Sequence, residues 1–109
     1  MRTNPHWLDV VRSRIRNTRA PLLLVLQHHI IEARTVIAAP LRPASGGASL
    51  LNPTLRIGGL AYGVALLDMA AVPLLSLGEV IGSALDQADA VTDGLDAIFR
   101  GHPVGLPVF

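Results

Sequence analysis

The residues best suited to chemistry in this sequence are two adjacent histidines, His28 and His29. Neighbouring side chains point to opposite faces of a strand, and on a helix they diverge by about 100°. A zinc site needs three or four converging ligands. We therefore expect these two imidazoles to lie on the surface or to be partly packed, and we expect no metal site.

Motifs that mark common catalytic centres are absent from the sequence. It has no Gly-rich phosphate-binding loop, no Gly-x-Ser-x-Gly sequence and no His-Glu-x-x-His sequence, which are signatures of nucleotide binding, acyl transfer and zinc-dependent proteolysis. It also has no cysteine, which excludes disulfides, zinc–thiolate sites and thiol nucleophiles. We expect a protein that acts by binding another protein, without catalytic residues and without a cofactor.

The charges are distributed unevenly, although the formal net charge is only +1. Residues 1–20 contain five arginines and one aspartate, a balance of +4, whereas residues 79–100 contain five acidic residues and one arginine, a balance of −4. A basic segment suits nucleic acid, but this one has no Lys and no aromatic residues interleaved for base stacking. A solvated arginine-rich hairpin is the favoured interpretation, and we do not expect direct nucleic-acid binding.

Length and composition indicate a single domain over residues 1–109. Half of the 109 residues are apolar, which suffices for one core and leaves no room for a second. Residues 1–7 lack the apolar stretch of an export signal, and the longest uncharged apolar run, 57–67, is shorter than the roughly 20 residues that span a membrane. We therefore expect a cytoplasmic protein, with 102–109 as a C-terminal tail.

The first half of the chain contains one clear strand and one ambiguous segment. Residues 7–12 are predicted to form a strand, and the polar residues 13–19 are predicted to form a loop or hairpin tip. Residues 22–31 fit both a buried strand and a helical stripe, and their periodicity favours a helix.

The middle of the chain contains the clearest β signal. The segment at residues 35–39 is expected to end at Pro40 as a strand. Residues 41–53 are predicted to be a loop. Residues 55–67 are predicted to form a hairpin, because their central Gly-Gly pair supplies the positive φ angles of a tight turn. Residues 69–77 contain Pro73 and are expected to be an edge strand or an irregular connection, which Gly78 closes.

The most regular element is an amphipathic helix near the C-terminus, despite Gly94. Apolar residues recur at spacings of three and four, and aspartates occupy the opposite face. The apolar positions are Ala84, Ala88, Val91, Leu95 and Ile98, and the acidic positions are Asp86, Asp89, Asp93 and Asp96. Ser83 or Asp86 is expected to cap the start, and Gly101 is expected to end the helix. The acidic stripe suits a basic partner, although such stripes are more often simply solvated.

Six short stretches of the sequence resemble the CcdB family, the toxin half of a bacterial toxin–antitoxin pair. The resemblance spans roughly residues 8–101. The matching stretches are Leu26-Gln27-His28-His29-Ile30-Ile31, Ala39-Pro40-Leu41, Leu51-Asn52-Pro53 with Ile57-Gly58, Asp68-Met69-Ala70-Ala71-Val72-Pro73, Gly78-Glu79-Val80 and Ile98-Phe99-Arg100-Gly101. The stretch from Asp68 to Pro73 is the most specific of them.

The resemblance implies a fold and a set of partners. The fold is mainly β, an SH3-like barrel or antiparallel sheet with one C-terminal α-helix, in which residues 22–27 form a strand. The protein is implied to be a homodimer that binds the A subunit of DNA gyrase, traps gyrase on cleaved DNA without a cofactor, and is neutralised by a small antitoxin protein. The implied target-binding residues are Asp96, Phe99, Arg100, Gly101 and His102, with Ile30 and Ile31 as a secondary surface.

Two positions depart from the family pattern, which ends in Trp-Gly-Ile after a Phe. Arg100 and His102 stand where the family has Trp and Ile, and the tail after them extends past the family's usual end. A buried Trp is a typical anchor of a protein interface, and an arginine cannot fill the same apolar slot. These departures favour an alternative, a diverged protein that still binds an antitoxin but no longer poisons gyrase.

A ribonuclease is the alternative from the enzyme class, because a related toxin family on a similar barrel cleaves RNA. RNA cleavage needs a general base and cationic groups around one phosphate. The residues that would have to converge are Arg12, Arg14 and Arg16 with Glu32 or Asp68.

Overall fold

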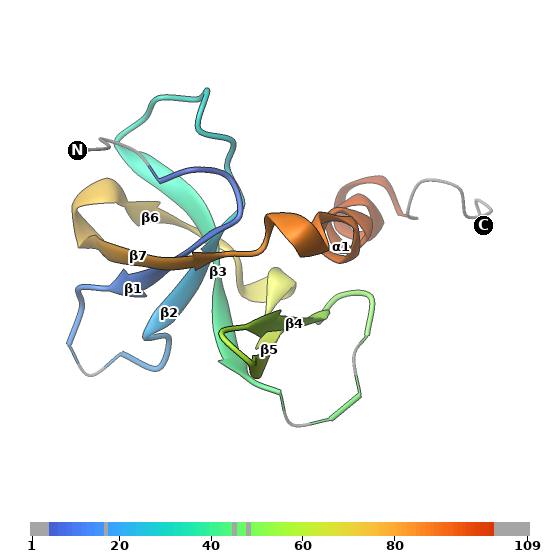
Figure 1. Ribbon diagram of the computed structural model, residues 1–109. Coiled ribbons are helices and arrows are strands. Elements are labelled where there is room, and N and C mark those ends of the chain that lie inside the picture. The colour runs from blue at the N-terminus through green and yellow to red at the C-terminus, as the bar shows by residue number, and fades with distance from the viewer. Residues whose placement is uncertain (1–4, 17, 45, 48, 102–109) are drawn as a thin grey trace.

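Strands dominate the part of the chain that the computed structural model describes, residues 5–16, 18–44, 46–47 and 49–101. They form one antiparallel sheet that curls on itself, and a helix extends from it towards the C-terminal end (Figure 1). The elements are β1 (Asp9–Ser13), β2 (Leu22–Val25), β3 (Thr35–Pro43), β4 (Thr54–Ile57), β5 (Leu60–Val64), β6 (Ala70–Pro73), β7 (Leu77–Ser83) and α1 (Ala88–Arg100), with single 3-10 turns at Leu66–Asp68, Leu74–Ser76 and Leu85–Gln87. The predicted fold class, mainly β with one C-terminal helix, is confirmed.

The longest strand, β3, makes the sheet curl because it changes partner along one edge. The strand order is β4-β5-β3-β2-β1-β7, and β6 also pairs with β3. Residues 35–38 of β3 pair with β6, and residues 41–43 pair with β5. Pro40 lies where β3 changes from β6 to β5 as its partner, and its carbonyl accepts the N–H of Ala65 at 3.0 Å. Proline has no N–H to donate, and at this point no neighbouring strand requires one. The predicted strand end at Pro40 is therefore wrong, because β3 continues to Pro43 and includes the start of the expected loop 41–53.

Residues 22–31 are not helical, so the interpretation from periodicity is wrong. Leu22–Val25 is strand β2, as the resemblance implies, and a loop at residues 26–34 follows it. Leu24 packs into one apolar cluster, whereas Leu23 and Val25 pack into another. A strand that is buried on both faces is apolar throughout and shows no alternation, so its sequence period does not distinguish it from a helix.

The hairpin around Gly58 and Gly59 is confirmed. β4 and β5 pair from Ile57 with Leu60 to Thr54 with Gly63. The two turn glycines have φ angles of 59° and 81°, the positive values that a two-residue type I′ turn requires. β5 ends at Val64, three residues before the predicted end, because the following turn carries Leu66 into the core.

Strand boundaries elsewhere differ from the predictions for local reasons. β1 starts at Asp9 because Leu8 has a φ of 63° and cannot continue a strand. β6 is an edge strand, as expected for a segment with Pro73, and among the described strands it pairs only with β3. β7 was not predicted: Gly78 is a strand residue there, and a Cβ at this position would lie 3.1 Å from the carbonyl oxygen of Arg12 on β1.

Two apolar clusters lie on the two faces of the sheet. The larger lies between the sheet and α1, and its fully buried members include Leu8, Val10, Leu24, Leu55, Leu66 and Val91. The smaller consists of Val11, Leu23, Val25, Val36, Ala38 and Leu77. Burial of both faces explains why the strands read as continuous apolar runs. No helix in the described residues is long and apolar enough to cross a membrane.

The start of α1 differs from the prediction, because neither Ser83 nor Asp86 caps it. The helix begins at Ala88, and the preceding Gln87 makes no capping bond with its side chain. The Gln87 side chain instead bonds to β4, where its Oε1 accepts the N–H of Arg56 at 2.7 Å and its Nε2 donates to the Arg56 carbonyl at 2.8 Å. Gln87 thus replaces a neighbouring strand on the free edge of β4 and fixes α1 to the sheet.

We expect Gln87→Ala to lower the free energy of unfolding by about 1–2 kcal/mol, because two hydrogen bonds to the main chain are lost. Urea unfolding at a fixed protein concentration measures this change. Gln87→Glu keeps the acceptor but places a carboxylate oxygen opposite the Arg56 carbonyl oxygen and beside Asp86, so it should cost at least as much as Gln87→Ala. Equal stability of Gln87→Ala and the parent would show that these bonds do not hold the helix.

Candidate functional site

The last turn of α1 places a large apolar side chain in solvent. Phe99 is 71% exposed, although the same helix is anchored to the core by the buried Val91 and Gly94. Burial of such a ring against a partner gains about 1.5–3 kcal/mol. A rigid helix therefore presents an unpartnered aromatic side chain, the type of residue that dominates protein interfaces.

Asp96, Arg100 and Gly101 lie around Phe99, so the structure brings together the predicted target-binding residues that it describes. Arg100 Nη1 is 3.8 Å from Asp96 Oδ1, and their side chains are 55% and 18% exposed. A surface pair of this kind contributes only about 0.3–0.5 kcal/mol, but it directs the guanidinium back along the helix. His102 and the tail lie outside the described residues.

Gly101 ends the helix as predicted. Its φ angle is 82°, and its N–H donates to the carbonyl of Ala97 at 3.1 Å. This left-handed conformation favours glycine. Phe99 and Arg100 therefore belong to the last complete turn of α1, and the chain changes direction directly after them.

Ile30 and Ile31 are both exposed, at 78% and 56%, in the loop between β2 and β3. Gln27 ties this loop together: its Oε1 accepts the N–H of Ile37 at 3.3 Å, and its Nε2 donates to the Ile31 carbonyl at 3.4 Å. In a single copy of the chain this loop and the end of α1 are separate projections of the molecule (Figure 1). The structure does not bring the secondary surface together with the helix end.

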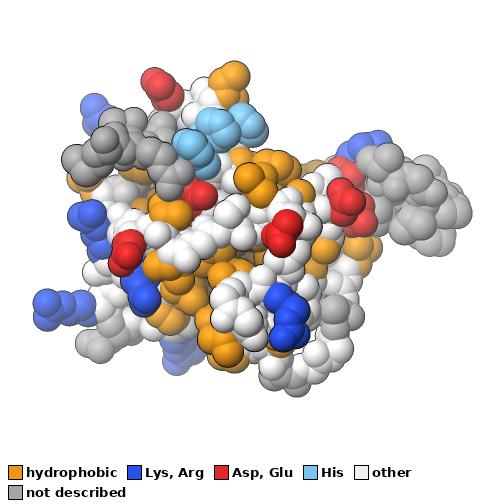
Figure 2. All heavy atoms as spheres, in the orientation of Figure 1, with side chains coloured by type: hydrophobic (Ala, Val, Ile, Leu, Met, Phe, Trp, Pro, Cys, Tyr) orange, Lys and Arg blue, Asp and Glu red, His pale blue; other side chains and the backbone are white. Residues whose placement is uncertain are grey.

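The basic and acidic regions of the sequence meet where β1 pairs with β7, which carries Glu79, whereas the aspartates of α1 lie on a separate element. Arg12, Arg14, Arg16 and Arg19 are exposed on β1 and the connection that follows it. On α1, Asp89 is exposed, and Asp93 and Asp96 are half-buried, so the acidic stripe is only partly solvated. Figure 2 shows most basic side chains over the strands, with acidic side chains both among them and near the helix.

The residues of the ribonuclease alternative do not pair with one another. Arg12 lies 3.9 Å from Glu79 on the neighbouring β7, and Asp68 pairs with Arg42 at 3.1 Å. Glu32 is exposed in the loop between β2 and β3. Because each of the two ion pairs joins a residue of the proposed set to one outside it, the geometry gives this alternative no support.

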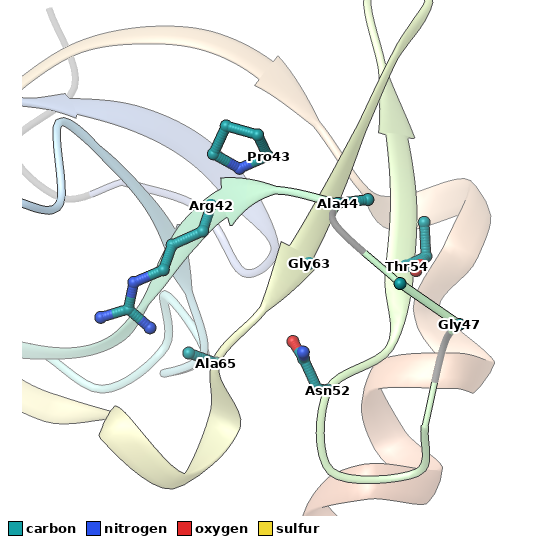
Figure 3. Close-up of a pocket in the computed structure, with 9 residues that line it drawn as sticks. Arg42, Pro43, Ala44, Gly47, Asn52, Thr54, Gly63 and Ala65 are labelled. Carbon is teal, nitrogen blue, oxygen red and sulfur yellow. The ribbon is translucent and has the colours of Figure 1, made fainter.

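A polar hollow of about 200 Å³ lies where β3, β5 and the segment before β4 meet (Figure 3). Its lining includes Arg42, Asn52, Thr54 and Gly63. A Cβ at Gly63 would lie 3.0 Å from Asn52 Oδ1, so the glycine leaves space for the asparagine side chain. This hollow has no local signal in the sequence, because its residues come from three separate segments. It shares no lining residue with the end of α1.

His6, His28 and His29 lie close together in the described part of the chain. Among the described residues, no group of three or more His, Asp or Glu side chains is arranged to hold a metal ion. His28 and His29 are exposed and stack on each other, with ring centroids 4.2 Å apart. The stack itself was not predicted, because its third ring, His6, comes from a distant segment.

The sequence of the chain matches a known protein family. The model of the family described as CcdB protein matches residues 8–101, nearly all of the chain. The chain belongs to the CcdB family. It is therefore a toxin component of the CcdB type, from a family that is not one of classical enzymes. A comparison with curated proteins gives no match to an individual protein.

The CcdB match ends at Gly101, the residue that ends α1. It includes the exposed Phe99 and the pair of Arg100 with Asp96, but not the tail at residues 102–109. The described part of the candidate surface is thus contained in the CcdB domain itself. Position 100 lies within the match, whereas His102 lies outside it.

Proposed function

We propose that this CcdB-type toxin binds the A subunit of DNA gyrase through the end of α1 and inhibits the enzyme. The observation that carries the proposal is Phe99, an aromatic side chain left 71% exposed at the end of a helix whose other face is buried. Asp96, Arg100 and Gly101 surround it, and we include His102 in the same surface. The toxin acts by binding, in the bacterial cytoplasm, without catalysis and without a cofactor.

A homodimer is part of the proposal. The resemblance to the family implies two copies, and other large apolar side chains are exposed on the sheet. Leu75 is 87% exposed between β6 and β7, and Ile37 on β3 is 42% exposed. A second copy would supply the apolar cover that these side chains lack in one chain. Light scattering after gel filtration measures the mass directly.

Controlled expression in the bacterial host tests the proposal. We expect growth to stop after induction, gyrase A to be captured by the tagged toxin, and cleaved DNA to accumulate on gyrase. Co-expression of the small antitoxin should restore growth. Normal growth together with no capture of gyrase A would contradict the proposal.

A second candidate function is supported by Arg100. Its guanidinium is charged and pairs with Asp96, so it cannot fill an apolar slot made for an indole without the cost of burying a charge. We therefore also consider a protein that binds an antitoxin but does not poison gyrase. Antitoxin binding in a pull-down, with normal growth and no gyrase capture, would select this candidate.

A further inference from the structure

Stacked aromatic rings join the start of the described chain to the loop at residues 26–34. The ring centroids of His6 and His29 are 4.4 Å apart, and those of His28 and His29 are 4.2 Å apart. Trp7 lies beside the stack, with its ring centroid 6.2 Å from that of His28. Figure 2 shows the histidine side chains as one group on the surface. The rings thus connect two segments that are distant in the sequence.

Two hydrogen bonds join the stack to the main chain. The Nδ1 atom of His29 accepts the main-chain N–H of Trp7 at 3.4 Å, and Nδ1 of His28 accepts that of Ile30 at 3.1 Å. An imidazole accepts through Nδ1 only while that nitrogen carries no proton. Protonation would turn each acceptor into a donor that faces an N–H group, and it would place like charges on rings 4.2 Å apart.

Other charged groups lie on the elements that meet here. Asp9 at the start of β1 accepts the main-chain N–H of His6 at 2.7 Å through Oδ2. Glu32 and Arg34 are exposed in the same loop as His28 and His29. Asp86 is also exposed, two residues after Ala84, whose N–H donates to the Leu8 carbonyl. A carboxylate can balance the charge of an imidazolium, but the two Nδ1 hydrogen bonds are lost whichever group balances it.

The chain next to the stack is strained and firmly anchored. Leu8 has a φ of 63°, a conformation that costs a non-glycine residue of order 1–3 kcal/mol. It is fully buried, its N–H donates to the Val25 carbonyl at 2.8 Å, and its carbonyl accepts the N–H of Ala84 at 2.9 Å. Leu8 therefore stays bound to the sheet when the rings separate. The change of conformation is confined to residues 5–7 and the loop 26–34.

We propose that the histidine stack is an acid-sensitive latch, which holds the loop 26–34 closed while its imidazoles are neutral and releases the loop when they take up protons. The open form binds more protons than the closed form, so a fall in pH favours opening. Imidazole ordinarily changes charge between pH 5 and 8. The latch controls the position of the loop that carries the exposed Ile30 and Ile31. It does not depend on which partner the toxin binds.

Amide hydrogen exchange in the full chain tests the latch. Between about pH 7.5 and about pH 5.5, across the range where imidazole titrates, the protection factors of the Trp7 and Ile30 amides should fall roughly tenfold or more. Leu24, in the middle of β2, is the internal reference and should keep its protection. Trp7 is the only tryptophan, so acrylamide quenching of its fluorescence should rise over the same range.

The double variant His28→Asn/His29→Asn is the matched control. The asparagine Oδ1 keeps an acceptor near the position of Nδ1 but gains no proton in this range. Its Trp7 and Ile30 protection should therefore be independent of pH. Two results would overturn the proposal: equal protection at both pH values in the parent, or the same loss of protection in the double variant. Circular dichroism shows whether the variant is folded.

Discussion

Replacement of Phe99 by alanine is expected to lower the affinity for gyrase A about 30-fold or more, which corresponds to the 2 kcal/mol or more of an interface hot spot. The ring is the largest exposed apolar group on α1 and is 71% exposed, so its truncation removes contact with the partner and little of the core. Surface plasmon resonance with immobilised gyrase A measures the change. Growth inhibition should fall in parallel.

Leu67→Ala is the matched control for Phe99→Ala. Leu67 is also a large apolar side chain and is almost equally exposed, at 69%, but it lies in the turn between β5 and β6. Its truncation should leave gyrase affinity unchanged, and both variants should unfold at the same temperature as the parent. If Phe99→Ala keeps full affinity, or if both variants lose affinity equally, the end of α1 is not the docking surface.

Replacement of Gly94 by alanine is expected to destabilise the fold by about 1–3 kcal/mol, the usual cost of overpacking a core. A Cβ at this position would overlap Leu66 Cδ1 and would lie 2.6 Å from the Leu50 carbonyl oxygen. Alanine is the better helix former by about 1 kcal/mol. The clash should exceed this gain, because a main-chain carbonyl cannot move aside as the end of a flexible side chain can. Urea unfolding measures the change.

Ala90→Gly is the opposite substitution on the exposed face of the same helix, and it should cost about 1 kcal/mol through propensity alone. The pair of variants separates packing from propensity. If packing decides, both changes destabilise the protein, although one adds and the other removes a methyl group. A more stable Gly94→Ala variant would mean that the helix does not approach residue 50 so closely.

Gly94 shows why some features could not be predicted from sequence. In the helical pattern it is only an unfavourable residue, and the reason for it lies in Leu50 and Leu66, more than 25 positions away. The histidine stack is similar, since His6 and His29 are adjacent only because β1 and β2 pair. The polar hollow lined by Arg42 and Asn52 likewise depends on the meeting of separate segments.

The sequence by itself determined the local elements whose signals lie within a few residues. The turn at Gly58 and Gly59, the apolar stripe of α1 and its end at Gly101 all follow from backbone preference and period, and the resemblance over residues 8–101 indicated the family. The resemblance, and not the period, indicated the strand at residues 22–25. Only the tertiary structure decided that β3 passes through Pro40 and that Gln87 joins β4 instead of capping α1. These outcomes depend on which neighbour covers each face or edge, because hydrogen bonding and burial between distant segments outweigh local preference.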